Sequence, residues 1–517
     1  MHRLFCILLA LAAPAACAAE AAQKPNIVYI LADDLGYGDV GCLNPQGKIP
    51  TPHIDRLARE GMVFTDAHSG SSVCSPTRYG ILTGRYSWRS RLKSGVLGGL
   101  SPRLIEPGRL TVASLLQQQG YHTACLGKWH LGMDWALLEG KPVSELSIET
   151  PEQVWNVDFS QAIAAGPNSV GFDYYFGISA SLDMVPYTFI ENDRVSVVPT
   201  RDAEFAMVLG RQAGKTRRGP AAEGFDAMHV LPAIRRKAVE YIGQRAADES
   251  GRPFFLYMPL ASPHTPILPT EQWRGKSGLN PYGDFVMETD AAVGAVLEAL
   301  DRHGLARDTL VIFTSDNGCS PMADFDELQA QGHHPSHVFR GHKADIFEGG
   351  HRVPFLVRWP ARVTGGSTSD RLVCLTDLVA TCAEIVGVAL PDTAGEDSVS
   401  FLPTLLGRGD GPPREAVVHH SVNGSFAIRQ GRWKLCLCPD SGGWSDPRPG
   451  QAPAGAAPVQ LFDLAEDIGE RVNLADKRPE VVELLTGLLE EYVERGRSTP
   501  GARQPNTAPV TIRRPRM

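Results

Sequence analysis

Four short apolar runs along the chain each lead into a cluster of polar residues. The runs cover positions 26–32, 121–126, 253–258 and 309–314, and the polar clusters follow directly or within a few residues. Consecutive apolar residues, rather than alternating ones, are typical of strands covered on both faces in a mostly parallel sheet. Because ligands bind at the carboxyl ends of such strands, we expect the four polar clusters to share one site.

Helical patterns fill the chain between these runs. They cover positions 52–60, 110–119, 234–247 and 285–303, and a glycine stands at or shortly after the end of each, as is typical of helix termination. Alternating strands and helices predict an α/β fold with a large, doubly wound, mostly parallel central sheet flanked by helices.

The pattern changes after about residue 415. Short runs at 426–429, 433–436 and 460–464 predict antiparallel strands around a loop rich in glycine, proline and alanine, and 479–495 predicts an amphipathic helix. We therefore expect one domain over 20–415 and a small C-terminal α+β domain with an antiparallel sheet over 416–517. The tail beyond Ser498 is expected to stay loose.

Composition and charge narrow the function. The 517 residues exceed the size of a single core, and 50 basic against 58 acidic side chains leave a formal charge of -8. Because no basic tract is present, the sequence argues against a nucleic acid partner.

Residues 1–19 have the pattern of a secretory signal peptide. Arg3 precedes an apolar run at 4–13, and small residues follow at 16–18. We expect cleavage there and export to the periplasm or the exterior. Lipid attachment at Cys17 is the less favoured alternative, because Pro14 fits a lipoprotein motif poorly. The later sequence contains no apolar run long enough for a membrane span.

The cysteines beyond that segment are scattered. Their spacing predicts neither a disulfide scaffold nor a structural zinc site. A bridge between Cys374 and Cys382 stays open.

One cysteine stands in a motif with chemical meaning. In the segment 71–78, Pro76 favours the first turn of a helix, and Gly84 is placed to end it. Cys74 then lies where unpaired backbone N–H groups favour an anion, with Arg78 on the same helix face. The alternative for Cys74 is a small buried apolar side chain.

Carboxylates and an amide follow two of the predicted strands. Asp33 and Asp34 come after the first, and Asp316 and Asn317 come after the last. Adjacent carboxylates repel each other unless a cation neutralises them. An all-oxygen ligand set suits Ca²⁺, with Mg²⁺ second, although paired aspartates in a loop are more often simply solvated.

Basic and imidazole side chains accompany these oxygens. They are Lys128, His130, His264 and Lys343. Each one taken singly is more typical of a surface lysine or of a hydrogen-bonded core histidine. After strand ends and beside a metal ion, they form a cationic rim complementary to the oxygens of an anion.

Together these motifs resemble the type I sulfatase family. The resemblance runs from Pro25 to about Leu474 and includes Cys-x-Pro-x-Arg at 74–78 and Gly-x-Leu-Thr-Gly-Arg at 80–85. It implies an alkaline-phosphatase-like sandwich fold and hydrolysis of sulfate monoesters. The other matching blocks, in the family's order, are Pro25-Asn26-Ile27 to Asp33-Asp34-Leu35-Gly36, Gly127-Lys128-Trp129-His130-Leu131-Gly132, Ser315-Asp316-Asn317-Gly318 and Lys343 through Glu348-Gly349-Gly350.

The resemblance also implies the cofactors and the site. A maturation enzyme oxidises Cys74 to formylglycine (3-oxoalanine), whose hydrate attacks sulfur. The calcium ligands implied are Asp33, Asp34, Asp316, Asn317 and the converted Cys74, and the further active-site residues are Arg78, Lys128, His130, His264 and Lys343.

Charge then suggests a role for each side chain. Arg78 stabilises the modified residue, and Lys128 and Lys343 hold sulfate oxygens. His264 or Lys343 protonates the leaving oxygen, and His130 orients or deprotonates the hydrate.

The sequence is most similar to bacterial members of the family that are arylsulfatase A-like and N-acetylgalactosamine-6-sulfatase-like. This implies a sulfated glycan, with a 6-O-sulfated galactose or N-acetylgalactosamine unit, or an aryl sulfate as substrate. Positions 332–340 and Asp183 are candidates for a sugar subsite, and equally for ordinary packed loop residues. The oligomeric state stays open.

Two other functions remain as alternatives. A phosphate or phosphonate ester hydrolase of the same superfamily would hold two transition metal ions. A non-catalytic glycan-binding protein would have lost active residues, whereas this sequence retains all of them.

Overall fold

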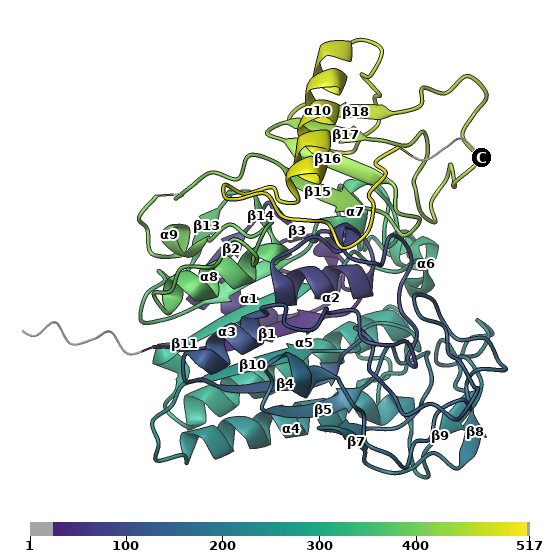
Figure 1. Cartoon of the computed structure of the whole chain (residues 1–517), viewed down its shortest axis with the longest axis vertical. Helices are drawn as coiled ribbons and strands as arrows, with labels where there is room; N and C mark the ends of the chain where they lie inside the picture. The colour runs from purple at the N-terminus through teal and green to yellow at the C-terminus, as the bar shows by residue number, and fades with distance from the viewer. Residues whose placement is uncertain (1–23, 410, 514–517) are drawn as a thin grey trace, which may run out of the picture.

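A ten-stranded sheet runs through the molecule (Figure 1). The computed structural model describes residues 24–409 and 411–513, so the predicted signal peptide and Cys17 lie outside the described residues. The strands, in their order across the sheet, are β13 (Ser367–Ser369), β2 (Met62–Phe64), β12 (Phe355–Arg358), β11 (Thr309–Ser315), β1 (Asn26–Ala32), β10 (Phe254–Pro259), β4 (His122–Lys128), β5 (Tyr174–Ile178), β6 (Ile190–Glu191) and β7 (Arg194–Val195).

The centre of this sheet is parallel. Strands β11, β1, β10, β4 and β5 all run in the same direction, whereas β12 and β6 pair antiparallel at either side. The four strands predicted from apolar runs are confirmed, and they are neighbours. The sequence pattern missed β5 and β12. Each of these strands is followed in the chain by another strand rather than by a helix.

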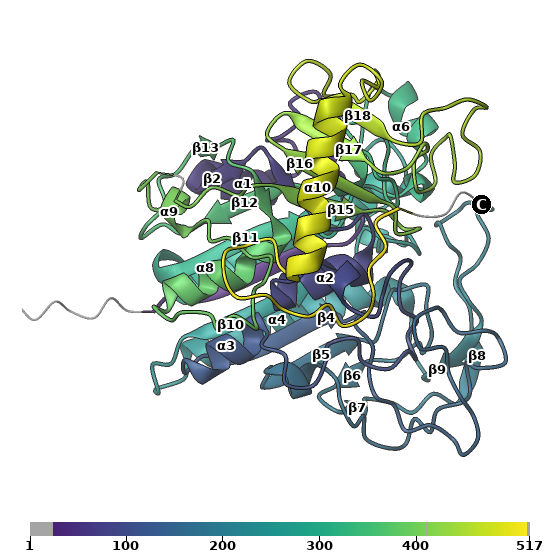
Figure 2. The same cartoon turned by 45° about the horizontal axis from the view of Figure 1, so that its top comes forward.

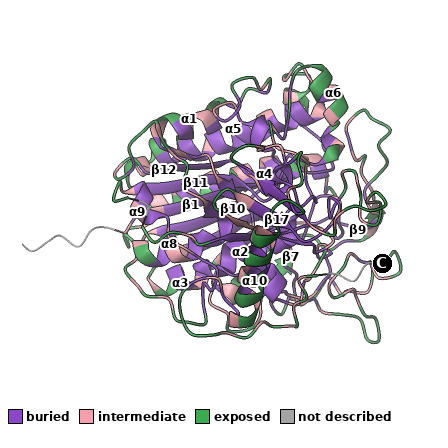
Figure 3. Cartoon of the chain, turned by 90° about the horizontal axis from the view of Figure 1, so that it is seen from above, coloured by how far each residue is buried: buried purple, intermediate pink, exposed green. Residues whose placement is uncertain are grey.

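Helices cover both faces of the sheet because side chains alternate along each strand. In β1, Ile27, Tyr29 and Leu31 pack into one core, and the intervening residues pack into the other. Figure 3 shows the buried strands between the two helical layers. One layer contains α1 (Pro52–Glu60), α4 (Val230–Ala246) and α5 (Pro281–Arg302), and the other contains α2 (Cys74–Thr83), α3 (Val112–Gln118) and α8 (Leu378–Ile385).

Helix α5 begins earlier than the apolar pattern indicated. The sequence predicted a start at 285, but the side chain of Asn280 accepts a hydrogen bond from the backbone of Gly283, and Pro281 is the first helical residue. An asparagine cap followed by proline is a favourable helix start. The polar cap therefore sets the boundary four residues before the apolar periodicity becomes visible.

A carboxylate of α5 holds the first turn of α1. Asp290 accepts hydrogen bonds from the backbone N–H groups of His53 and Ile54, with the shortest at 2.8 Å. Burial raises the pKa of Asp290 to about 7, more than these N–H groups lower it. Between about pH 4, near the pKa of an aspartate in the unfolded chain, and about pH 7, Asp290 is protonated in the folded chain but ionised in the unfolded chain. The free energy of unfolding therefore falls as the pH rises through this range.

We expect Asp290→Asn to remove this pH dependence. Relative to wild type, the variant should gain about 2–4 kcal/mol in free energy of unfolding as the pH rises from about 4 to 7. Urea unfolding at several pH values measures the difference. Glu298→Gln, at an exposed position of the same helix, is the control and should show no such trend. A constant difference between Asp290→Asn and wild type would contradict the assignment.

A four-stranded antiparallel sheet follows the large one in the chain. It consists of β15 (Val417–His420), β16 (Phe426–Gln430), β17 (Trp433–Cys436) and β18 (Gln460–Asp463), of which the sequence pattern missed β15. Helix α10 (Pro479–Arg495), shown in yellow in Figure 2, packs on this sheet through Leu485, Leu489 and Tyr492. The sheet also meets the segment that leads to α2, since Ser71 forms a β-bridge with His420.

The expectation of a loose tail beyond Ser498 is wrong for the described part of that tail. The backbone N–H of Thr507 donates to the carbonyl of Arg89, and the guanidinium of Arg85 donates to the carbonyl of Pro505. Arg85 and Arg89 are buried, and the tail accepts from both guanidinium groups, because Arg89 also donates to Oδ1 of Asn506. Composition alone did not reveal this role.

The eight cysteines of the described residues are all free. The bridge between Cys374 and Cys382 that the sequence left open is therefore not formed. Within residues 24–409 and 411–513, no helix combines the length and the apolar character needed to cross a membrane.

Candidate active site

The predicted site residues meet at one edge of the large sheet. Asp33 and Asp34 follow β1, Asp316 and Asn317 follow β11, and Lys128 is the last residue of β4. The remaining members, all buried like the first five, are Cys74, Arg78, His130, His264 and Lys343. The parallel sheet thus brings the polar clusters together as the strand pattern predicted.

Cys74 is the first residue of α2. Val73 before it is extended, and Gly84 ends the helix in the left-handed conformation, with φ of 64°. The sulfur of Cys74 lies 3.6 Å from Oδ1 of Asp33. Burial raises the pKa of the Cys74 thiol, so the unmodified side chain stays protonated and is a poor nucleophile.

Arg78 lies one helical turn after Cys74 and binds a carboxylate. Its Nε and a terminal nitrogen donate to Oδ2 of Asp316 at 3.0 and 2.8 Å, and it also donates to the carbonyl of Lys128 at 2.9 Å. The sequence placed Arg78 on the helix face of Cys74. Its main partner in the structure is Asp316, while Asp33 lies at 3.6 Å.

Two lysines approach the paired carboxylates. Nζ of Lys128 lies 2.7 Å from Oδ2 of Asp33, and Nζ of Lys343 lies 2.7 Å from Oδ2 of Asp34. Burial by itself raises the pKa of Asp33, but Lys128 and the other surrounding cations hold it well below its usual range. Burial and the charge of Asp33 raise the pKa of Asp316 to about 7. The site is thus crowded with carboxylates that compete for positive charge.

A glycine allows the end of β4 to lie so close to β10. Gly127 has φ of 142°, and a Cβ atom there would lie 1.9 Å from the carbonyl oxygen of Pro259. Only glycine tolerates both the backbone angle and this contact. Gly127 therefore lets Lys128 enter the site directly from the strand.

The oxygens of this cluster fit a hard cation. Oδ1 of Asn317 is buried and has no hydrogen-bond partner. One ligand atom each from Asp33, Asp34, Cys74 and His264 lies within 4.8 Å of the others. Oxygen-rich sites of this kind suit Ca²⁺. Asp316 points one oxygen at Arg78 and the other at the backbone N–H of Asp34, 3.3 Å away.

Both histidines of the site have one nitrogen available. Nε2 of His130 lies 2.8 Å from the carbonyl of Leu97, while Nδ1 has no partner. Burial, followed by the charge of Lys128, lowers the pKa of His130 well below its ordinary value, and burial lowers that of His264. Nδ1 of His264 contacts the carbonyl of Thr265, so Nε2 faces the site, 3.7 Å from Asp34.

Backbone strain accompanies these positions. His130 has φ of 57° and Asp34 has φ of 67°, in the left-handed region that non-glycine residues rarely adopt. Such strain persists where the surrounding structure holds a side chain in a required direction. Both residues lie at the ends of strands that contribute to the site.

One aromatic side chain beside the site was not predicted from the sequence. The ring of Trp444 lies 5.9 Å from Nζ of Lys343, and 42% of the residue is exposed. Its backbone N–H donates to the buried carboxylate of Asp345 at 2.8 Å. The only signal in the sequence was a tryptophan within a glycine- and serine-rich loop.

The candidate sugar-subsite residues have varied surroundings. Asp183 forms a 2.8 Å ion pair with Arg217, and buried His333 bonds Asp39 at 2.8 Å. His333 is thus a buried structural residue rather than a subsite residue. A groove of about 830 Å³ is lined by part of segment 332–340, and its polar lining includes Asn44, His334, His337, Arg340 and Arg471.

Comparisons with known proteins identify the family. A family model described as Sulfatase matches residues 25–388. N-acetylgalactosamine-6-O-sulfatase of Bacteroides thetaiotaomicron is 35% identical over 512 residues, covering 92% of this chain and 94% of the relative. Human arylsulfatase A is 33% identical over 498 residues, covering 93% and 89%.

A solved structure shares the fold over nearly the same length. It comes from Bacteroides thetaiotaomicron, and its description refers to a "6S-sulf" protein and to the metabolism of multiple glycosaminoglycans. It is 34% identical, with a TM-score of 0.75, and the match covers 91% of this chain and 99% of the other. The chain has an alkaline-phosphatase-like fold, belongs to the sulfatase family and is a sulfuric ester hydrolase.

Proposed function

We propose that this protein hydrolyses sulfate monoesters of a sulfated glycan, using formylglycine made from Cys74 and a bound calcium ion. The observation that carries the proposal is Cys74 at the start of α2, surrounded by carboxylates, two lysines and His264. We also propose that the protein is exported to the periplasm or the exterior, and that its two domains meet at 415/416.

Conversion of Cys74 to formylglycine would replace a poorly nucleophilic thiol. A thiol whose pKa is raised by burial cannot readily attack sulfur. The hydrated aldehyde would supply two hydroxyl groups on one carbon, one for attack and one whose deprotonation permits release of sulfate.

The surrounding side chains bind and orient the ester. Lys128 and Lys343 each project an ammonium group into the carboxylate cluster, where they can also hold sulfate oxygens. Nδ1 of His130 has a free lone pair and is suited to accept the hydroxyl proton. Nε2 of His264, or the ammonium of Lys343, is suited to protonate the leaving oxygen. Arg78 holds Asp316 in place through two hydrogen bonds to Oδ2.

Asp33, Asp34, Asp316, Asn317 and the converted Cys74 would hold the calcium ion. When bound, the ion lowers the pKa of a coordinated hydroxyl and neutralises sulfate charge. His264 lies close to the carboxylates. Because calcium prefers oxygen ligands to imidazole nitrogen, we assign His264 a catalytic position beside the ion rather than a role as its ligand.

Chelation should therefore stop the reaction. We expect EDTA to lower sulfate release by at least about 10²-fold, as expected when the charge-stabilising ion is lost. Added Ca²⁺ should restore the activity more fully than Mg²⁺, because the crowded all-oxygen site suits the larger ion. Sulfate released by the chelated and reconstituted enzyme is the measurement. Undiminished activity after complete removal of metal would contradict the calcium assignment.

The substrate proposal rests on the relatives and on Trp444. The two relatives described above are named N-acetylgalactosamine-6-O-sulfatase and arylsulfatase A. The exposed ring of Trp444 beside Lys343 offers an apolar face to a sugar ring whose sulfate lies in the site. We therefore propose a 6-O-sulfated galactose or N-acetylgalactosamine unit.

A panel of defined sulfated monosaccharides and oligosaccharides tests this proposal. The 6-sulfates of galactose and N-acetylgalactosamine should release sulfate faster than the 2-, 3- or 4-sulfates, and the corresponding 6-phosphates should react more slowly. Trp444→Ala should raise KM for the glycans several-fold and leave kcat for a small aryl sulfate nearly unchanged. Faster hydrolysis of the phosphates would favour the phosphate ester alternative, and an inert protein with formylglycine in place would favour the binding-protein alternative.

A further inference from the structure

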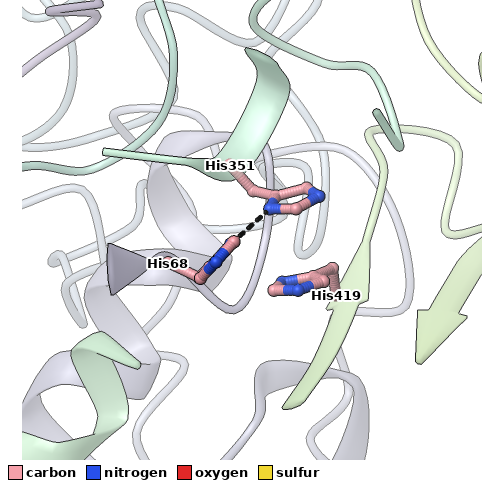
Figure 4. Close-up of side chains that lie close together, drawn as sticks. All are labelled: His68, His351 and His419. Atoms are coloured by element: carbon pink, nitrogen blue, oxygen red, sulfur yellow. Dashed lines mark hydrogen bonds between the residues drawn. The ribbon is translucent and has the colours of Figure 1, made fainter. Parts of the chain in front are cut away.

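Three buried histidines meet outside the active-site cluster (Figure 4). His68 ends β3 (Ala67–His68), His351 ends α7 (Glu348–His351), and His419 lies in β15. All three residues are 0% exposed. One ring nitrogen of each lies within 4.8 Å of the others. The tertiary structure therefore brings together three imidazoles that are far apart in the chain.

The outward nitrogens of these rings have acceptors. Nε2 of His68 lies 2.7 Å from Asp66, Nδ1 of His419 lies 3.0 Å from the carbonyl of Ser69, and Nε2 of His351 lies 3.2 Å from the carbonyl of Ile346. Donors also reach two of these nitrogens, since Nη1 of Arg429 lies 3.0 Å from Nε2 of His68 and Nζ of Lys434 lies 3.0 Å from Nε2 of His351. In the tautomers that place the hydrogen on the outward nitrogen, the inward nitrogens carry lone pairs, which is the arrangement of metal-binding histidines.

The inward nitrogens lie close together. Nδ1 of His68 and Nδ1 of His351 are 3.1 Å apart, and Nε2 of His419 is buried without a hydrogen-bond partner. Two ligands on a tetrahedral zinc ion, with Zn–N bonds of about 2.0–2.1 Å, have their nitrogens about 3.4 Å apart. The observed spacing is close to this value.

A chain of hydrogen bonds explains only part of the cluster. Nζ of Lys434 lies 3.0 Å from Nε2 of His351, so a chain from Lys434 through His351 and His68 to Asp66 satisfies two rings. It leaves Nε2 of His419 without a partner, because that ring stacks on His351, with centroids 3.7 Å apart, and its contact to Ser69 uses Nδ1. Burial lowers the pKa of all three histidines, which favours the neutral form that binds metals.

We propose that His68, His351 and His419 form a second metal site, which takes Zn²⁺ or a similar borderline divalent ion. Imidazole ligands favour such ions over calcium, so the site is distinct from the oxygen cluster near Cys74. To bind the ion, His351 and His419 must tilt out of their parallel stacking. The ion would link the strand that precedes α2, the helix α7 and the C-terminal sheet, and so stabilise the approach to the active site.

Metal content and thermal unfolding test this proposal in protein produced with added zinc and then dialysed. The background is Cys74→Ala with excess Ca²⁺, which removes the only cysteine of the active-site metal cluster. His419→Asn in that background removes Nε2 while its amide can still donate to Ser69. His303→Asn, at an exposed position, is the matched control.

We expect about one zinc ion per chain in the background and in the control, a higher Tm with zinc than after EDTA, and a Co²⁺ absorption spectrum of nitrogen ligation. His419→Asn should bind zinc at least about tenfold more weakly and lose the zinc-dependent rise in Tm. Circular dichroism in EDTA should show that this variant is folded. Zinc retention far below one ion in the background, or equal retention in His419→Asn, would overturn the proposal.

Discussion

Replacement of Cys74 by alanine should lower sulfate release by about 10⁴-fold or more, while the protein remains folded. The residue is the first of α2 and its sulfur lies 3.6 Å from Asp33, so it is the side chain that the surrounding cations and carboxylates face. Removal of the sulfur also removes the group from which formylglycine would form. A small residue at this helix start disturbs the fold little.

Mass spectrometry connects this loss to the modification. In wild type produced with a maturation enzyme, the peptide containing Cys74 should carry the aldehyde, and activity should increase with the converted fraction. Cys74→Ser should be as inactive as Cys74→Ala if the host's maturation enzyme accepts only cysteine, because a single hydroxyl offers no route to release sulfate. Cys42→Ser is the control, since Cys42 is partly exposed and belongs to a different segment. Full activity of Cys74→Ala would refute the proposed chemistry.

Replacement of Arg78 by methionine should destabilise the protein by about 3–5 kcal/mol and abolish activity. Arg78 and Asp316 are both fully buried, and two guanidinium nitrogens bind one carboxylate oxygen. Without Arg78, the carboxylate of Asp316 lies buried beside Asp33 with less compensating charge. Urea unfolding in EDTA isolates this effect from metal binding.

A double variant distinguishes the lost ion pair from lost packing. Arg78→Met combined with Asp316→Asn removes both charges, so it should recover more than half of the lost stability while staying inactive. Arg56→Met is the control, because Arg56 forms partly exposed ion pairs with Glu60 and Asp301; it should cost about 1 kcal/mol or less. Additive losses in the double variant would contradict the electrostatic explanation.

Local patterns were sufficient for the main elements. The apolar runs predicted β1, β4, β10 and β11, because a strand buried on both faces needs consecutive apolar residues. The start of α5 was less well predicted, since Asn280 and Pro281 set it through capping rather than through apolar periodicity. The short strand β15 was missed because four residues are too few to show a recognisable hydrophobic pattern.

The position of the site was also predictable, but its contacts were not. Parallel strands must end at a common edge, so Asp33, Lys128 and Asp316 were expected near one another. No local pattern indicated that Arg78 would pair with Asp316 or that Trp444 would lie beside Lys343, because these contacts join segments far apart in the chain.

For this protein, then, the sequence alone determined the fold class, the location of the polar site and, through its motifs, the resemblance to sulfatases. Periodicity and short motifs report on local structure and on chemistry that is carried by neighbouring residues. Only the tertiary structure decided which charges pair, that the tail covers Arg85 and Arg89, and that His68, His351 and His419 meet. Those contacts depend on long-range packing, which sets the distances and the burial on which ion pairing and metal binding depend.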